Sequence, residues 1–134
     1  MRKKIVYLAG LMTGLTSEEA MKWRFNAAGL LKDMYNCYTP DYDPKTNQTG
    51  KEIWDRDYYY VDNSDIVLVN FDYNNDKPFI GTSMEIARAH YQNKPIIMFS
   101  TKDWVHNSKT FNYHATKITK TLKEAIDYIK AYYY

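Results

Sequence analysis

Apolar residues follow two different periods along this chain, and the two periods alternate. Short runs that are rich in apolar and β-branched residues predict strands at residues 4–9, 37–39, 65–71 and 95–99. Apolar residues at helical spacing predict helices that begin near residues 16, 52 and 82, and a last helix that includes residues 122–129. Strands that alternate with helices through right-handed crossovers form a three-layer α/β sandwich around a mainly parallel sheet.

The first helix has the clearest local signals. Thr16-Ser-Glu-Glu19 has the form of a capping box, which predicts the start of the helix. One apolar stripe follows and predicts the side that faces the sheet; it consists of Trp23, Ala27, Leu30, Leu31 and Met34. The stretch between Phe99 and Leu122 has no comparable pattern.

The length of 134 residues and the 45% apolar content fit one domain, residues 1–134, with a single core. The net charge of +2 comes from dispersed lysines, so we expect neither a nucleic-acid polymer nor a membrane as partner. The apolar start lacks a cleavage site, and the lone Cys37 cannot form an internal disulfide, which together favour the cytoplasm. Fourteen tyrosines suit pockets and subunit interfaces, so an oligomer is expected.

Several common kinds of site lack their signature here. No G-x-G-x-x-G follows the first strand, and Gly10-Leu-Met-Thr-Gly14 lacks the Gly-Lys-Ser/Thr ending of a P-loop. His90, His106 and His114 have no metal-ligand spacing with one another or with Cys37. We therefore predict no metal and no cofactor.

The segment Gly81-Thr-Ser-Met-Glu85-Ile-Ala-Arg-Ala89 is the most informative one. Its glycine allows a ligand to approach the backbone, and its carboxylate is placed in the first helical turn, at the carboxyl end of the sheet. However, Thr82-Ser-Met-Glu85 also has the form of a capping box, in which Glu85 would only bond a backbone N–H. The local sequence leaves both interpretations open.

Three further polar residues are placed at the same edge of the predicted sheet: Tyr7 in the first strand, Asp57 before the third and Asp72 directly after it. Carboxyl groups crowded in a partly desolvated pocket titrate apart, so one can be an anionic nucleophile while another carries a proton. Glycosyl transfer requires that division. A solvated helix face and a strand-end turn remain the alternatives for Asp57 and Asp72.

The residues described so far, together with Val6-Tyr-Leu-Ala-Gly10, Asp65-Ile-Val-Leu-Val-Asn-Phe-Asp72 and Lys94-Pro-Ile-Ile97, resemble the nucleoside 2-deoxyribosyltransferase family. This family includes relatives that hydrolyse deoxynucleoside 5'-monophosphates. The resemblance covers most of the chain. It implies a flavodoxin-like or Rossmann-like sandwich with a five-stranded sheet, and a homodimer or higher homo-oligomer with shared active sites.

The resemblance also implies roles for individual residues. Glu85 would attack the anomeric carbon and hold the deoxyribose covalently, Tyr7 would hydrogen-bond that carboxylate, and Asp57 or Asp72 would protonate the base, with Asp57 favoured. Substrate-binding positions are expected around these residues. They are Gly10, Met12 and Thr13 in the first loop, Gly81, Thr82 and Ser83 before Glu85, and Asn107 and Ser108 for the neighbouring subunit's site.

Three functions remain open. The leading one is transfer of deoxyribose from a deoxynucleoside to a free nucleobase with retention of configuration. The second is hydrolysis of a deoxynucleoside 5'-monophosphate whose phosphate is bound near Gly10, Thr13 and Gly14. The third is a non-catalytic nucleotide- or flavin-binding module, in which Thr13, Thr16 and Ser17 bind phosphate and Glu85 is only a helix cap.

Overall fold

The computed structural model describes residues 2–12, 14–40 and 47–134. They form a five-stranded sheet of order β2-β1-β3-β4-β5 in which every adjacent pair is parallel. The strands are β1 (Lys4–Gly10), β2 (Tyr35–Tyr38), β3 (Ile66–Asn70), β4 (Ile96–Phe99) and β5 (Lys117–Thr119). The helices are α1 (Ser17–Leu31), α2 (Gly50–Asp62), α3 (Ile80–Tyr91), α4 (Asp103–His106), α5 (Lys109–His114) and α6 (Leu122–Tyr132).

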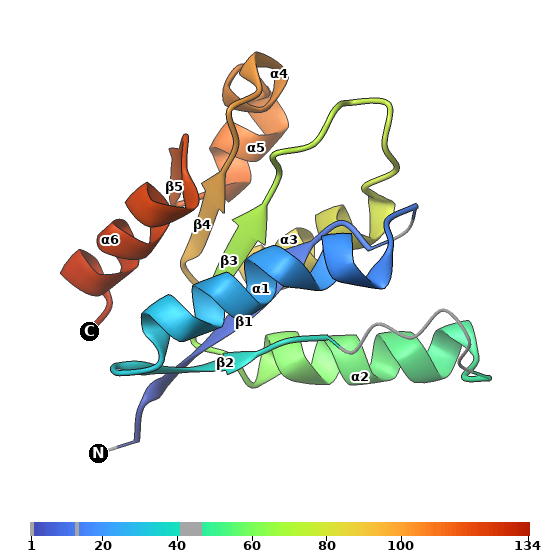
Figure 1. The fold of residues 1–134 in the computed structure, drawn as a ribbon, viewed down its shortest axis with the longest axis horizontal. Coiled ribbons are helices and arrows are strands. Elements are labelled where there is room, and N and C mark those ends of the chain that lie inside the picture. Colours follow the sequence, from blue (N-terminus) through green and yellow to red (C-terminus); the bar gives the residue numbers. More distant parts are fainter. Residues whose placement is uncertain (1, 13, 41–46) are drawn as a thin grey trace.

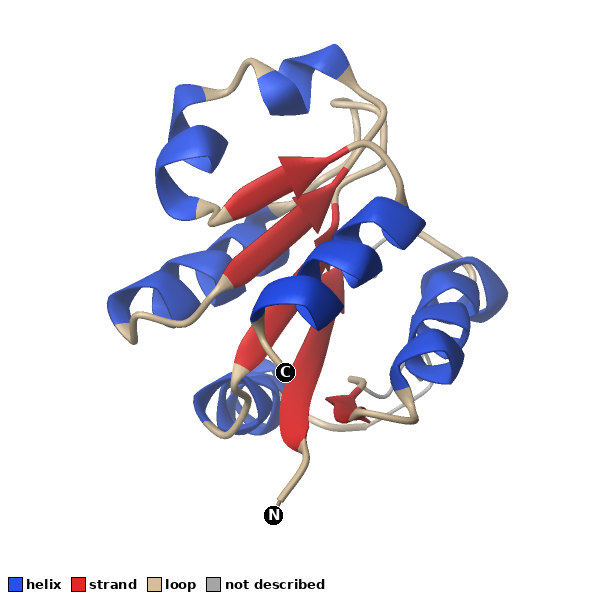
Figure 2. Cartoon of the chain, turned by 90° about the vertical axis from the view of Figure 1, so that its left-hand side faces the viewer, coloured by secondary structure: helices blue, strands red, loops and turns tan. Residues whose placement is uncertain are grey.

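Helices cover both faces of the sheet, as Figures 1 and 2 show. On one face, Val6, Leu8 and Leu68 pack against side chains of α1 and α6. On the other face, Tyr7 and Val67 are buried with side chains of α2, α3, α4 and α5. The three-layer α/β sandwich with a five-stranded parallel sheet is thus confirmed. Across the described residues, no helix combines the length and the apolar character needed to cross a bilayer.

The four predicted strands and four predicted helices are all present, with ends shifted by a few residues. The stretch without a clear pattern contains α4, α5 and the edge strand β5. These elements have only four, six and three residues, too few for a periodicity to stand out.

The predicted contact stripe of α1 is partly wrong. Thr16 caps the helix in a full capping box, as expected. However, Leu30 and Met34 are exposed, and the buried face contains Arg24 in addition to small and apolar residues. The helix is therefore turned so that a charged side chain enters the core.

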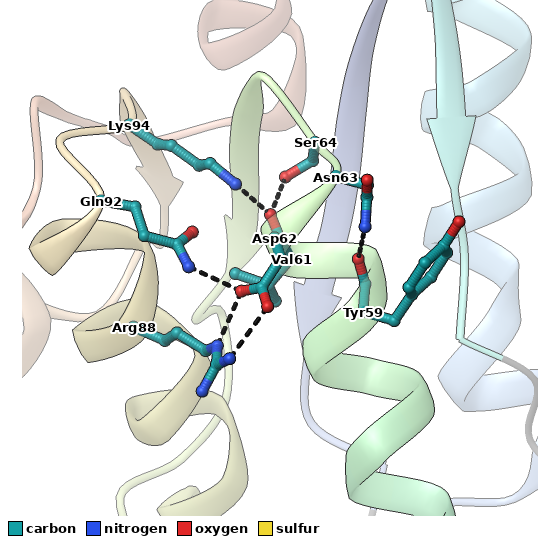
Figure 3. Close-up of polar contacts among 8 residues, drawn as sticks. All are labelled: Tyr59, Val61, Asp62, Asn63, Ser64, Arg88, Gln92 and Lys94. Atoms are coloured by element: carbon teal, nitrogen blue, oxygen red, sulfur yellow. Dashed lines mark hydrogen bonds and ion pairs between the residues drawn. The ribbon is translucent and has the colours of Figure 1, made fainter.

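Helices α2 and α3 are fastened together at their carboxyl ends (Figure 3). The Asp62 carboxylate accepts hydrogen bonds from Arg88 at 2.7 and 2.9 Å and from Gln92 at 2.6 Å. The Arg88 hydrogen bonds hold the pKa of Asp62 at about 2. Lys94 and Ser64 donate to the carbonyl of Val61. These contacts fix α3 beside α2, and the two helices carry Glu85 and Asp57.

Candidate active site

A hydrogen bond between Tyr7 and Glu85 joins β1 to α3 in the protein interior. The phenol of Tyr7 donates to Oε2 of Glu85. Tyr7 is fully buried, and the Glu85 side chain is only 6% exposed. The chain thus places an ionisable carboxyl group where water barely reaches it, with one phenol as its hydrogen-bond donor.

The capping-box interpretation of Glu85 is wrong. Helix α3 begins at Ile80 after the N-cap residue Phe79, and no side chain caps it. Glu85 therefore lies in the second turn of the helix, not the first, and its carboxyl group reaches Tyr7 instead of a backbone N–H of its own helix. A buried carboxyl group that is not a helix cap needs another explanation.

Burial dominates the electrostatics of Glu85 and raises its pKa to about 8. The hydrogen bond from Tyr7 lowers this pKa, the nearby charge of Asp57 raises it, and the charge of Arg24 lowers it. Burial, with the charges of Glu85 and Asp57, also raises the pKa of Tyr7 far above its ordinary range, so the phenol stays a donor. Glu85 and Asp57 therefore form an interacting acid pair.

Asp57 comes from α2 and is half-buried, with 15% of its side chain exposed. The guanidinium Nε of Arg56 lies 3.5 Å from its Oδ1. The structure thus brings together three of the four residues predicted to be catalytic: Tyr7, Asp57 and Glu85.

Arg24 is a residue of this site that the sequence did not reveal. It is fully buried, and its guanidinium donates to the carbonyl oxygens of Leu8 (3.2 Å) and Gly10 (3.0 Å) and to that of Ala20. Burial lowers the pKa of Arg24. Electrostatic interactions with four nearby residues raise it: Tyr73, Tyr7, Glu85 and Asp57.

The position of Arg24 follows from the lengths of the strands. The carbonyl of Ile5 bonds to Asp65 beside β3, so alternation turns the carbonyls of Leu8 and Gly10 toward β2. Strand β2 ends at Tyr38, opposite Tyr7, and cannot bond them. Arg24 supplies the missing donors and at the same time places a positive charge near Glu85.

Gly10 and Gly81, which are predicted to bind the substrate, each lie close to a tryptophan ring. A side chain on Gly10 would meet the Trp23 ring at 3.1 Å, and one on Gly81 would meet Trp54 at 3.2 Å. Gly10 also accepts the hydrogen bond from Arg24. Both glycines therefore serve the packing of the site's walls, whatever they also contribute to a ligand.

Asp72 lies apart from the acid pair. Its Oδ1 accepts hydrogen bonds from the backbone N–H of Thr101 (2.8 Å) and from the Thr101 hydroxyl (2.5 Å), which ties the end of β3 to the end of β4. It is exposed and lines a cavity on the α1 side of the sheet. The groups that shift the pKa of Glu85 do not include Asp72.

The remaining predicted binding residues are spread along the same edge. Thr82 is buried and Ser83 half-buried, both in the first turn of α3. The Met12 carbonyl accepts from the Leu15 N–H, whereas Thr13 lies outside the described residues. Asn107 follows α4 and is exposed, and the Ser108 hydroxyl caps α5 by accepting from the N–H of Phe111.

Among the described residues, no group of three or more His, Cys, Asp or Glu side chains could hold a metal ion.

The fold is similar to that of solved 2-deoxyribosyltransferase structures. A 2-deoxyribosyltransferase from Leishmania mexicana superposes with a TM-score of 0.74 at 15% identity, over 98% of this chain and 99% of that one. The enzyme from Bacillus psychrosaccharolyticus superposes with a TM-score of 0.71 at 18% identity, over 92% and 91%. A conserved protein from Enterococcus faecalis V583 superposes with a TM-score of 0.74 at 15% identity, over 97% of this chain and 99% of that one. No protein-family model matches the chain, and no curated protein matches it by sequence.

Proposed function

We propose that this protein is a nucleoside 2-deoxyribosyltransferase that acts through a covalent intermediate on Glu85. The observation that carries the proposal is the buried Glu85 carboxyl group bonded to Tyr7 and paired electrostatically with Asp57. The near-complete superposition on two 2-deoxyribosyltransferases at low identity supports it through the fold. The substrates are then a deoxynucleoside and a free nucleobase.

In the first half-reaction, an oxygen of ionised Glu85 attacks C1' of the deoxyribose. The bond from C1' to the base breaks, and its electron pair goes to the base nitrogen, which takes a proton. In the second half-reaction, a nitrogen of another base attacks C1', the carboxylate leaves, and the proton of that nitrogen returns to Asp57. Two inversions at C1' give net retention.

The acid pair supplies both the anion and the proton. A pKa of about 8 means that Glu85 holds its proton at neutral pH when Asp57 is ionised. The reactive form has the same single proton on Asp57 instead, with Glu85 ionised. It is the less populated of the two ways in which the pair can hold one proton. Tyr7 stabilises the anion by its hydrogen bond, and Asp57 gives its proton to the departing base.

Hydrolysis of a deoxynucleoside 5'-monophosphate is the second candidate. It uses the same glycosyl-enzyme intermediate, with water in place of the acceptor base. A non-catalytic module is disfavoured because it treats Glu85 as a helix cap, whereas the carboxyl group is bonded to Tyr7.

A homodimer that completes the site is part of the proposal. Large apolar side chains project from α2, α3 and α5: Tyr59 is 60% exposed, Ile80 74%, Met84 51% and Tyr113 73%. A second copy packed on these helices would bury them beside the turn that carries Glu85. Sedimentation equilibrium of the protein and of Met84→Lys tests it: a dimer that the substitution dissociates supports the proposal, and a monomeric wild type contradicts it.

Chromatography of thymidine incubated with adenine tests the main proposal. The wild type is expected to form deoxyadenosine and Glu85→Ala is not. Trapping of the deoxyribosyl group on Glu85, seen as an added mass on the peptide that contains it, would establish the intermediate. Free base released from thymidine 5'-monophosphate without exchange would favour the hydrolase instead.

A further inference from the structure

A cavity lies on the α1 side of the sheet, at the carboxyl end of β3. It has a volume of about 630 Å³, within the range of small-molecule sites. Its walls are the N-terminal half of α1, the loop that follows β3, and Lys102 beyond β4. Tyr7, Asp57 and Glu85 do not line it. It is therefore separate from the pair proposed to cleave the glycosidic bond.

Three lysines from three different segments line this cavity: Lys22, Lys77 and Lys102. Within the part of the chain that the structure describes, none of them forms an ion pair. The two acids of the wall have hydrogen-bond donors elsewhere, since Glu19 accepts from the Thr16 N–H and Asp72 accepts from Thr101. The charge of Lys77 also acts on Glu19, without a hydrogen bond between them. The cavity therefore offers three ammonium groups without a carboxylate bonded to any of them.

The rest of the wall is neutral and has apolar and amide groups. Trp23 and Leu15 supply apolar surface, and Asn26, Asn70 and Asn74 supply amides. The Trp23 ring is fixed in place by Phe99, at a centroid distance of 5.7 Å, and by the guanidinium of Arg24, 4.9 Å from its centroid. A ligand that fits this wall has an apolar or heterocyclic part in addition to its charge.

We propose that this cavity binds a small phosphorylated molecule of about the size of a nucleoside monophosphate. A phosphate group carries up to two negative charges and several acceptor oxygens, which matches several lysines better than a single carboxylate does. The three lysines bind the phosphate, and the indole and amide wall holds the organic part. The proposal does not rest on the transferase activity, because the three lysines are not among the residues proposed to cleave the glycosidic bond.

The three tryptophans allow binding to be located directly. Trp23 lines the cavity, Trp54 contacts Gly81 at the start of α3, and Trp104 packs on Phe71 and Phe79. Their indole N–H signals in nitrogen-15 NMR spectra, assigned by Trp→Phe substitution, report these places separately. Thymidine 5'-monophosphate is expected to shift the Trp23 signal in a saturable way, and to shift it more than thymidine, which can reach only Gly10 beside the Trp23 ring. Inorganic phosphate should shift it with at least about tenfold weaker affinity.

The matched variants replace three lysines at a time by alanine. Lys22→Ala/Lys77→Ala/Lys102→Ala is expected to weaken the Trp23 response at least about tenfold, whereas Lys32→Ala/Lys109→Ala/Lys120→Ala, with the same change of charge on exposed side chains, leaves it unchanged. A Trp23 signal that does not respond to the nucleotide at millimolar concentration, or a response that survives the cavity substitutions, overturns the proposal. Equal affinity for phosphate and nucleotide overturns the organic part of it. No step requires turnover, so this test can fail while the transferase assay succeeds, and the reverse.

Discussion

The phenol of Tyr7 in β1 donates a hydrogen bond to the carboxyl group of Glu85, which lies 78 residues further along the chain in α3. Neither residue has meaningful exposure to water, so the ionisation of Glu85 depends on the few groups around it. Two of these, Tyr7 and Arg24, favour the anion, and the charge of Asp57 disfavours it. Each group can be altered singly, and each alteration moves the pH dependence of the reaction in a stated direction.

The transferase activity of the wild type should fall as the pH rises through about 8. The pair of Glu85 and Asp57 loses its last proton there, and the base can no longer leave in protonated form. The measurement is kcat/KM for thymidine and adenine across the pH range. An activity that instead rises through pH 8 would mean that Glu85 acts alone and that the proton comes from elsewhere.

Asp57→Asn should invert this profile. Without Asp57, the pKa of Glu85 falls, no residue of the pair protonates the base, and activity rises with pH as Glu85 ionises. The rate with thymidine should drop about 10²- to 10⁴-fold, the usual worth of a general acid. A 7-methylated deoxyguanosine, whose base leaves without protonation, should react at nearly the wild-type rate. Equal losses with both substrates would contradict a role as acid.

Tyr7→Phe removes the only side-chain hydrogen bond that stabilises the Glu85 anion among the described residues. The pKa of Glu85 should then rise by about one to two units, because a hydrogen bond to a charged group is worth about 1.5 to 3 kcal/mol. The alkaline fall of activity should move upward with it. Tyr60→Phe is the control, since the Tyr60 ring lies 6.5 Å from that of Tyr7 without bonding Glu85. An unchanged profile in Tyr7→Phe would show that the phenol only fills space.

Strands β1, β3 and β4 could be predicted from the sequence because they are mostly apolar, as central strands of a parallel sheet must be. Strand β5 could not, because its three residues lie at the edge and only Thr119 is buried. Tyr7, Asp57 and Glu85 could be placed through the family resemblance. Arg24 could not, because its burial depends on the point at which β2 ends, which is a property of the assembled sheet. Its one signal was a charge among small residues on the buried side of α1.

Glu85→Gln should stabilise the folded protein, increasingly so as the pH rises. The folded-state pKa of about 8 lies above the ordinary 4.5, so between these values the folded protein holds a proton that the unfolded chain has lost. The free energy of unfolding of the wild type therefore falls by up to about 1.4 kcal/mol per pH unit in this window, relative to the variant. Urea unfolding of both proteins at pH 5 and pH 8 measures the difference. The same difference in free energy of unfolding between wild type and variant at both pH values would show that burial does not raise the pKa of Glu85.

Arg24→Lys should destabilise the protein and raise the pKa of Glu85 only slightly. One ammonium group cannot replace a guanidinium that bonds the carbonyls of Leu8 and Gly10, so at least one buried acceptor loses its partner. The expected loss is about 1 to 3 kcal/mol for each such acceptor, measured by urea unfolding. The positive charge remains, which preserves most of its effect on Glu85, whereas Arg24→Met removes it and should move the alkaline fall of activity upward. Arg2→Lys, at an exposed pair with Asp65, should change the stability by less than about 1 kcal/mol. A loss of stability in Arg24→Lys as small as in this control would contradict the proposed role of Arg24, which is to bond the carbonyls of β1 that β2 does not reach.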